Sequence, residues 1–179
     1  MNRLAAMIAL TVLASAGPAD AQPSAPSPSA QAALPTPPAQ AAALPLALAT
    51  EAAQTAITTC AMNGYRVTVV VVDAAGAPRL VLAGDGAPGR TVEIGQRKAF
   101  TAATLNRPGT EIVEQVRTDE SLARRIAADT RMIPWAGARP VRRADGTLIG
   151  ALGVSGAPGG DKDDACAAAG ISRIQDRIG

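Results

Sequence analysis

The sequence predicts an α+β domain in which a central antiparallel β-sheet of about five strands is flanked by α-helices on both faces. The first observation that predicts this fold is the order of the elements: a helix, a hairpin, further helices, a second hairpin and a last helix. Hairpins join antiparallel strands, whereas a parallel doubly wound sheet needs a crossover helix after every strand. The second observation is the scarcity of aromatic residues, 2% of the chain. A core of Val, Ile, Leu and Ala requires helices that lie close to the sheet.

The first half of the domain is predicted as a helix followed by a hairpin. Apolar residues recur at helical spacing over 46–60, and the Asn-Gly pair at 63–64 is a natural stop. A near-continuous run of valines within 65–72 fits a central strand that is covered on both faces. A turn over 73–78 then leads into a second strand over 79–83.

The second half is predicted as helices, a hairpin and a last helix. A helix over 91–105 ends at a Pro-Gly pair, and residues 110–128 form two short helical pieces, with Asp119 as the cap of the second. Strands over 139–143 and 148–155 flank an Asp-Gly turn. The glycine-rich loop after the second of these strands predicts the floor of a pocket.

The first 44 residues are predicted to lie outside the domain. Arg3, a hydrophobic stretch too short to span a bilayer, and a small-x-small site ending at Ala21 predict a signal peptide over 1–21. Cleavage there would deliver a periplasmic or secreted protein; the alternative is a cytosolic chain with a ragged start. Residues 22–44, almost wholly Pro, Ala, Ser and Gln, predict a disordered linker or else a partner-binding polyproline segment. Residues 45–179 suit one domain.

Composition excludes several classes of function. The chain has no histidine, which removes Ser-His-Asp and Cys-His catalysis, histidine-rich zinc sites and the commonest haem ligand. Its 17 basic and 15 acidic residues nearly balance, and no basic cluster interleaves with aromatic residues, so nucleic-acid binding is not expected. Since no second hydrophobic span follows the first, we expect no membrane span in the mature protein. No metal site is predicted.

The two cysteines lie on the apolar faces of the first and last predicted helices. Because both helices are expected to pack on the sheet, Cys60 and Cys166 could meet and form a disulfide after export. Closing a loop of about 105 residues would contribute roughly 4–5 kcal/mol of chain entropy. The alternative is two separately buried thiols that act as small apolar residues. Neither cysteine has a basic neighbour that would make it a reactive thiol.

Three segments together resemble one known family. The first is Val67–Gly76, VTVVVVDAAG, a strand that ends in a D-x-x-G turn. The second combines Asp85-Gly86-Ala87 with RKAFTA over 97–102, like the D-G-A and K-A-x-T-A elements of that family. The third is Ile149–Gly156, IGALGVSG. Their order and spacing resemble the GlcG/HbpS-like family of haem-binding or haem-degrading domains, which is related to the C-terminal domain of PduO proteins.

The resemblance covers nearly everything from Leu46 onward. It implies a compact antiparallel domain that assembles into homo-oligomers and binds haem, in some secreted members beside sensor kinases or in iron handling. This chain has Arg90 where many relatives carry a histidine. It also has GARPV over 137–141 where relatives often read G-G-x-P-I, which adds a methyl group and a guanidinium near the expected pocket.

Several charged residues are candidates for ligand binding. Lys98 could hold a carboxylate, such as a haem propionate or a small organic acid, or it could be a solvated lysine on a helix face. Arg90 and Arg139 have the same two interpretations, an anion clamp or a surface charge. Asp85, between two glycines, could bind a cation or a ligand hydroxyl, or could bond its own backbone in a turn.

Backbone groups and axial ligands complete the candidate site. Ser155 and Gly156 end the buried strand, so their N–H groups could face a ligand oxygen, although a plain strand-to-helix connection explains them equally. A haem would need an axial ligand other than histidine, and the candidates are Met132, Tyr65, Lys98, the Thr101 hydroxyl and water. Met132 and Tyr65 could instead be plain packing residues, which is the favoured interpretation.

Two further features could contribute to a site or to packing. Trp135 is the one large flat side chain, and it could stack on a porphyrin or cover a sheet edge. The last helix begins at Asp161, and Asp164 three residues later forms a capping box with it. Asp161, Asp163 and Asp164 therefore favour the helix dipole with no ligand needed, and weak binding of a metal ion is the alternative.

The sequence supports three hypotheses about function. The first is an exported protein that binds haem and sequesters, transports or senses haem or iron as a homo-oligomer. Any haem degradation would be slow and would depend on an external reductant or peroxide, so a binding protein is favoured over an enzyme. The second is an enzyme or binding protein for a small hydroxy- or oxo-carboxylic acid, whose carboxylate Lys98 and Arg139 would grip. The third is a structural or adaptor subunit without a ligand.

Overall fold

The computed structural model describes residues 43–179. The predicted signal peptide, and the predicted linker up to residue 42, lie outside the described residues. Within the described part of the chain, no helix has both the length and the apolar composition needed to cross a membrane.

The predicted α+β fold with an antiparallel sheet is confirmed, and the described residues form four strands where about five were expected. The sheet order is β2-β1-β4-β3, with every neighbouring pair antiparallel. Two hairpins supply all four strands, and the chain between the hairpins forms helices and loops without a fifth strand among residues 43–179. The strands are β1 (Thr68–Val72), β2 (Pro78–Ala83), β3 (Ala138–Arg142) and β4 (Leu148–Ser155).

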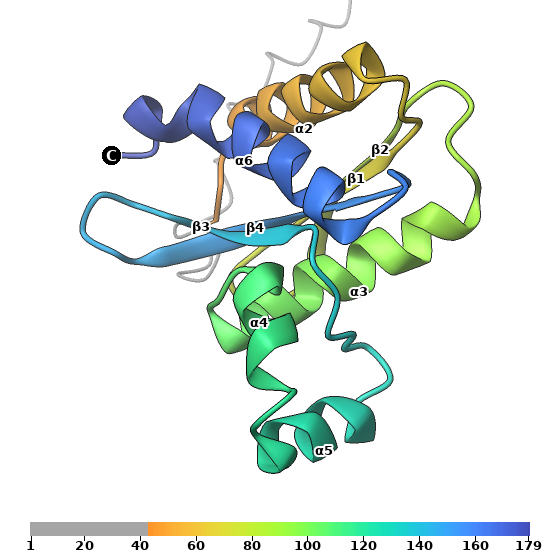
Figure 1. Cartoon of the computed structure of the whole chain (residues 1–179). Coiled ribbons are helices and arrows are strands. Elements are labelled where there is room, and N and C mark those ends of the chain that lie inside the picture. The colour runs from red at the N-terminus through yellow and green to blue at the C-terminus, as the bar shows by residue number, and fades with distance from the viewer. Residues whose placement is uncertain (1–42) are drawn as a thin grey trace, which may run out of the picture. The chain divides into compact units, whose positions relative to one another are not determined.

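Helices cover both faces of the sheet, as predicted (Figure 1). Helices α2 (Leu46–Met62) and α6 (Gly160–Ile174) lie side by side over one face, and α3 (Arg90–Leu105) lies under the other. Successive side chains of strand β1 point to opposite faces of the sheet, so the strand contributes to both cores. Val69 and Val71 belong to the core under α2 and α6, and Val70 and Val72 belong to the core over α3.

The core is built from small aliphatic residues, and the helices lie correspondingly close to the sheet. Helix α2 buries four alanines against the strands. Helix α3 crosses β4 at Gly153, where an added Cβ would come within 2.4 Å of the Gly95 carbonyl oxygen. The scarcity of large side chains in the sequence therefore corresponds to a close approach of helix and strand backbones.

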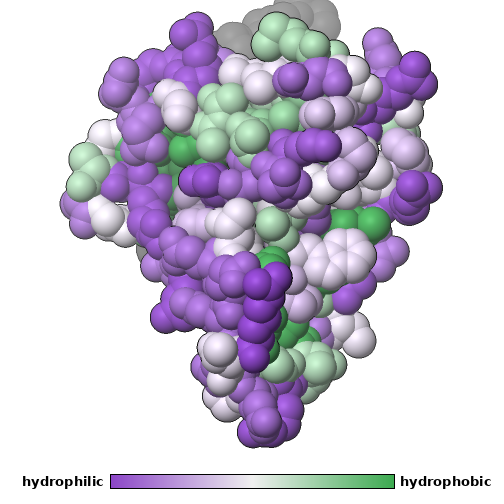
Figure 2. All heavy atoms as spheres, in the orientation of Figure 1, coloured by the Kyte–Doolittle hydropathy of each residue, from purple (hydrophilic) through white to green (hydrophobic). Residues whose placement is uncertain are grey.

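A smaller helical extension projects away from the sheet (Figure 1). It consists of α4 (Gly109–Gln115) and α5 (Glu120–Ala128), and its apolar side chains pack with Phe100 at the far side of α3. The predicted cap is confirmed, because the Asp119 carboxylate accepts a hydrogen bond of 2.9 Å from the Leu122 N–H. Figure 2 shows that hydrophilic residues cover most of the face of the domain in view, with apolar side chains in small separate patches.

The last helix begins at Gly160 without a side-chain cap, so the predicted capping box at Asp161 and Asp164 is wrong. Asp164 instead pairs with Arg139 of strand β3. Helix α6 continues into a short 3-10 turn, η1 (Gln175–Arg177). Its buried face carries Cys166, Gly170 and Ile174 against α2 and the sheet.

The predicted disulfide is confirmed. Cys60 near the end of α2 and Cys166 in the second turn of α6 are bonded, with Cα atoms 5.7 Å apart, and both residues are buried. The bond closes a sequence separation of 106 residues and ties together the two helices that cover one face of the sheet. It therefore constrains the position of the first turns of α6, which carry Asp163 and Asp164.

We expect loss of the disulfide to lower the free energy of unfolding by about 2–5 kcal/mol, because the unfolded chain regains the entropy of a long loop. Urea denaturation of the oxidised protein, of the protein in dithiothreitol, and of the Cys60→Ala/Cys166→Ala variant measures the difference. The variant serves as the control for the reductant, since its unfolding curve must be the same with and without dithiothreitol. Equal stability of the oxidised and reduced proteins would contradict the expectation.

Candidate functional site

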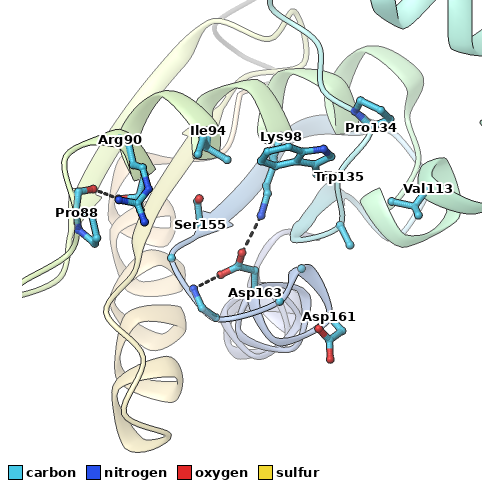
Figure 3. A pocket seen from close by; sticks show the side chains of 16 residues that line it. Pro88, Arg90, Ile94, Lys98, Val113, Pro134, Trp135, Ser155, Asp161 and Asp163 are labelled. Atoms are coloured by element: carbon cyan, nitrogen blue, oxygen red, sulfur yellow. Dashed lines mark hydrogen bonds and ion pairs between the residues drawn. The ribbon is translucent and has the colours of Figure 1, made fainter.

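A pocket of about 500 Å³ lies where several chain segments end. It is bounded by the first half of α3, the end of β4 with the glycine loop after it, the Pro134–Ala136 segment and the first turn of α6 (Figure 3). Its volume lies within the range of small-molecule sites. The glycine-rich loop thus forms part of a pocket, as the sequence predicts.

An ion pair closes the floor of this pocket. The Lys98 Nζ of α3 donates to Asp163 Oδ2 of α6 at 2.7 Å and to the Val154 carbonyl oxygen of β4 at 3.1 Å. The two side chains are only 3% and 4% exposed. The other carboxylate oxygen, Asp163 Oδ1, accepts the Ala157 N–H at 2.9 Å. Figure 3 shows Lys98 reaching from α3 toward Asp163 at the start of α6.

Burial raises the pKa of Asp163, and the Lys98 ammonium and the N–H groups of Ala157 and Gly156 oppose that effect by stabilising the carboxylate.

The absence of a side chain at Gly137 leaves room for the Lys98–Asp163 ion pair. An added Cβ at Gly137, whose φ is +113°, would lie 2.7 Å from the Asp163 Cβ and 2.8 Å from the Lys98 Nζ. The pair therefore depends on a glycine in the segment before β3.

The alternative that Lys98 is a solvated lysine on a helix face is wrong, and of the three acidic residues at the start of α6 only Asp161 is exposed. Lys98 is buried, and Asp163 and Asp164 are buried acceptors for cations from other elements. The sequence suggested that the N–H groups of Ser155 and Gly156 either face a ligand oxygen or belong to a plain strand-to-helix connection. The N–H groups of Gly156 and of the next residue, Ala157, bond Asp163. The protein's own carboxylate therefore occupies the position in which an external anion was expected.

Arg139 forms a second cation–carboxylate pair outside the pocket. Its Nε donates to Asp164 Oδ2 at 3.1 Å, and a second guanidinium nitrogen contacts the same oxygen. Arg139 does not line the pocket, so it does not share a ligand there with Lys98. The guanidinium of Arg139 in the GARPV segment therefore joins β3 to α6.

Four of the predicted site residues do meet in the pocket: Lys98, Arg90, Ser155 and Gly156. Arg90 is exposed at the start of α3. Ser155 is only 4% exposed, yet its side chain lines the pocket (Figure 3). Trp135, which the sequence singled out as a flat surface, lies on the pocket wall with 51% exposure.

The other candidates lie elsewhere. Asp85 and Tyr65 line a separate hollow beside the end of α2, and the Tyr65 ring lies 5.7 Å from the Lys162 ammonium. Met132 is buried in the apolar cluster of the helical extension. The Thr101 hydroxyl donates to the Arg97 carbonyl oxygen at 2.7 Å and accepts the Ile133 N–H at 2.8 Å, so both of its main hydrogen-bonding functions are used inside the protein.

Sequence reasoning missed the role of Asp163. The available signal was an acidic residue within one turn of a glycine loop, but helix starts commonly carry such residues for the dipole alone. Nothing in the spacing connected Asp163 with a lysine 65 positions earlier. The sequence also gave no sign that the apolar side chains of Ile94 and Val113 lie in the pocket wall, because nothing in their spacing connects them with the other pocket residues.

Comparison with known proteins identifies the family. The family model described as "Haem degrading protein HbpS-like" matches residues 44–172. This chain belongs to the HbpS-like family. No curated protein matches it.

Solved structures agree with this membership. A crystal structure of HbpS shares 36% sequence identity, with a TM-score of 0.68, over 74% of this chain and 90% of that one. A double mutant of Streptomyces reticuli HbpS shares 32%, with a TM-score of 0.67, over 88% and 99%. A haem complex of PduOC has the same fold, with 24% identity, a TM-score of 0.66 and coverage of 74% and 95%.

We expect either single removal in the Lys98–Asp163 pair to cost about 3–5 kcal/mol of unfolding free energy, because each leaves a buried charge without its partner. The variants are Lys98→Met, Asp163→Asn and the double variant, compared by urea denaturation at neutral pH. The double variant is expected to lose less than the sum of the two single losses, since it removes both charges. Additive losses would contradict a direct interaction.

The raised pKa of Asp163 also predicts a pH dependence. The folded protein keeps the Asp163 proton at pH values where the unfolded chain, with the ordinary value of 3.8, has released it. The stability that this proton contributes is fully present below pH 3.8 and is lost as the pH rises through the raised pKa. Relative to Asp163→Asn, the wild-type unfolding free energy is therefore expected to fall over that interval. A difference that rises with pH there would contradict it.

Proposed function

We propose that this chain is an exported haem-binding protein that sequesters, transports or senses haem or iron, and that the pocket beside Trp135 is its haem site. The observation that carries the proposal is the composition of the pocket wall. A large flat ring, several apolar side chains and an exposed guanidinium surround one opening of about 500 Å³. Membership of the HbpS-like family supports the same ligand, because the family description names haem and a structure of the same fold is a haem complex.

The pocket suits the porphyrin and its acidic groups. Trp135, Pro134, Ile94 and Val113 offer ring and aliphatic contacts to a flat apolar molecule. Arg90 at the rim could form charge-assisted hydrogen bonds with a propionate. Lys98 is less suited to that contact, because Asp163 already compensates its charge.

The pocket does not suit an axial bond from Met132 or Tyr65, two of the axial ligands that the sequence suggested. Met132 lies in the helical extension and Tyr65 beside the end of α2, and neither lines this pocket. The side chains that line it and carry oxygen donors near its floor and rim include Ser155 and Asp161. A porphyrin would therefore be held mainly by ring contacts and propionate charges. When bound, the iron would supply any redox chemistry.

Export and assembly are part of the proposal. The predicted signal peptide over 1–21 would send the chain out of the cytoplasm. The Cys60–Cys166 disulfide supports an oxidising compartment, because such bonds are rare in reducing cytosol. We extend the proposal to a homo-oligomer, for which the exposed edge strand β2 with Val81 at its surface offers a contact.

We expect haemin and metal-free protoporphyrin to bind the chain from Gln22 to Gly179 with affinities within about tenfold of each other, since ring and propionate contacts are common to both. Absorbance titration measures haemin binding, and quenching of Trp135, the one tryptophan, measures both. Trp135→Ala and Arg90→Met are each expected to weaken haemin binding on the order of tenfold.

Met132→Leu and Tyr65→Phe are the matched controls, and both are expected to leave the haemin affinity and the Soret band unchanged. A haemin response that never saturates would overturn the haem proposal. Loss of the Soret shift in Met132→Leu or Tyr65→Phe would overturn the assignment to this pocket.

A further inference from the structure

Two polar groups at the pocket floor have unused hydrogen-bonding capacity. Ser155 is the last residue of β4 and is only 4% exposed. Its hydroxyl opens into the pocket and makes no hydrogen bond with another group of residues 43–179, but it is not among the fully buried unpaired atoms (Figure 3). A hydroxyl that faces the pocket and bonds no other protein group is free to bond a ligand atom or a water molecule.

Lys98 supplies the second group. An ammonium has three donors, and two of them are used by Asp163 and by the Val154 carbonyl oxygen. Lys98 lines the same pocket as Ser155, and the ion pair fixes its position. One remaining N–H of Lys98 and the Ser155 hydroxyl are thus available to a ligand at the floor.

The charges of the floor and the rim differ. At the floor the Asp163 carboxylate compensates the Lys98 ammonium at 2.7 Å, so a second carboxylate placed there would be repelled by Asp163. A neutral oxygen, such as a hydroxyl or carbonyl, can accept a hydrogen bond there without that repulsion. At the rim, Arg90 has no carboxylate within ion-pair distance among the described residues.

We propose that the pocket also takes a small hydroxy- or oxo-carboxylic acid, and that Ser155 selects for its neutral oxygen. The carboxylate of such an acid meets Arg90 at the rim, and its hydroxyl or carbonyl oxygen meets Ser155 and Lys98 at the floor. The aliphatic part lies against Ile94 and Trp135. This inference rests on the same pocket as the proposed haem function and assigns it a second class of ligand.

The test compares acids that differ only in the neutral oxygen. Lactate, pyruvate and propionate are titrated against the chain from Gln22 to Gly179, with Trp135 fluorescence as the readout. Wild type is expected to prefer lactate or pyruvate over propionate on the order of tenfold, because the polar floor is left unpaired by propionate. Ser155→Ala is expected to abolish that preference and leave the propionate affinity unchanged, whereas Arg90→Met weakens all three acids.

Ser172→Ala is the matched control, since Ser172 is exposed on α6 away from the pocket, and it is expected to keep the wild-type preference. Folding is checked by the melting temperature. Ser155→Ala is expected to melt close to wild type, because the Ser155 hydroxyl faces the pocket and bonds no other protein group. The loss of preference in this variant then reports on the ligand contact.

The outcomes separate this inference from the haem proposal. Equal affinities of wild type for lactate, pyruvate and propionate, or a preference that persists in Ser155→Ala, would overturn the inference. If no acid changes the fluorescence while haemin still quenches it, the inference fails and the haem proposal stands. If the acids bind with the Ser155-dependent preference and haemin neither quenches nor competes, the inference stands and the haem proposal fails.

Discussion

The rest of the site depends on the Lys98–Asp163 ion pair, which connects the helices on the two faces of the sheet. Lys98 comes from α3 on one face of the sheet and Asp163 from α6 on the other, and they meet at the end of β4, where the Val154 carbonyl oxygen completes the contact. Both charges are removed from water, which costs free energy unless each keeps its partner. The start of α6, the end of β4 and the middle of α3 are therefore held in one arrangement.

The pocket inherits its polarity from this pair. Because Asp163 compensates Lys98, the floor presents hydrogen-bond donors and no excess positive charge, whereas the exposed part of the lining carries the guanidinium of Arg90 and the carboxylate of Asp161. Trp135 and the aliphatic side chains form the wall between them. A haem and a small hydroxy- or oxo-carboxylic acid can both use this rim and wall. They differ in whether they form hydrogen bonds with the floor.

Membership of the HbpS-like family does not transfer every residue role to this chain. The guanidinium of Arg139, which distinguishes this chain in the segment before the last hairpin, bonds Asp164 and not a ligand in the pocket. Arg90, where many relatives carry a histidine, does line the pocket and offers a charge in place of an iron ligand. The two substitutions therefore differ in kind: one changes packing between β3 and α6, and the other changes the chemistry of the rim.

Local patterns in the sequence determined the order of the elements and the close packing of small residues, because periodicity and turn residues act through neighbouring residues. They also indicated the partnership of Cys60 with Cys166, because two cysteines on apolar faces allow a single possible pair. They also placed Lys98, Arg90 and Ser155 among the candidates. Only the tertiary structure decided that Asp163, 65 residues from Lys98, neutralises it, that Arg139 pairs with Asp164, and that Met132 and Tyr65 lie outside the pocket. These facts depend on which helix crosses which strand end and at what distance. The sequence by itself contains the charges, but burial and the approach of elements distant along the chain determine which of them meet.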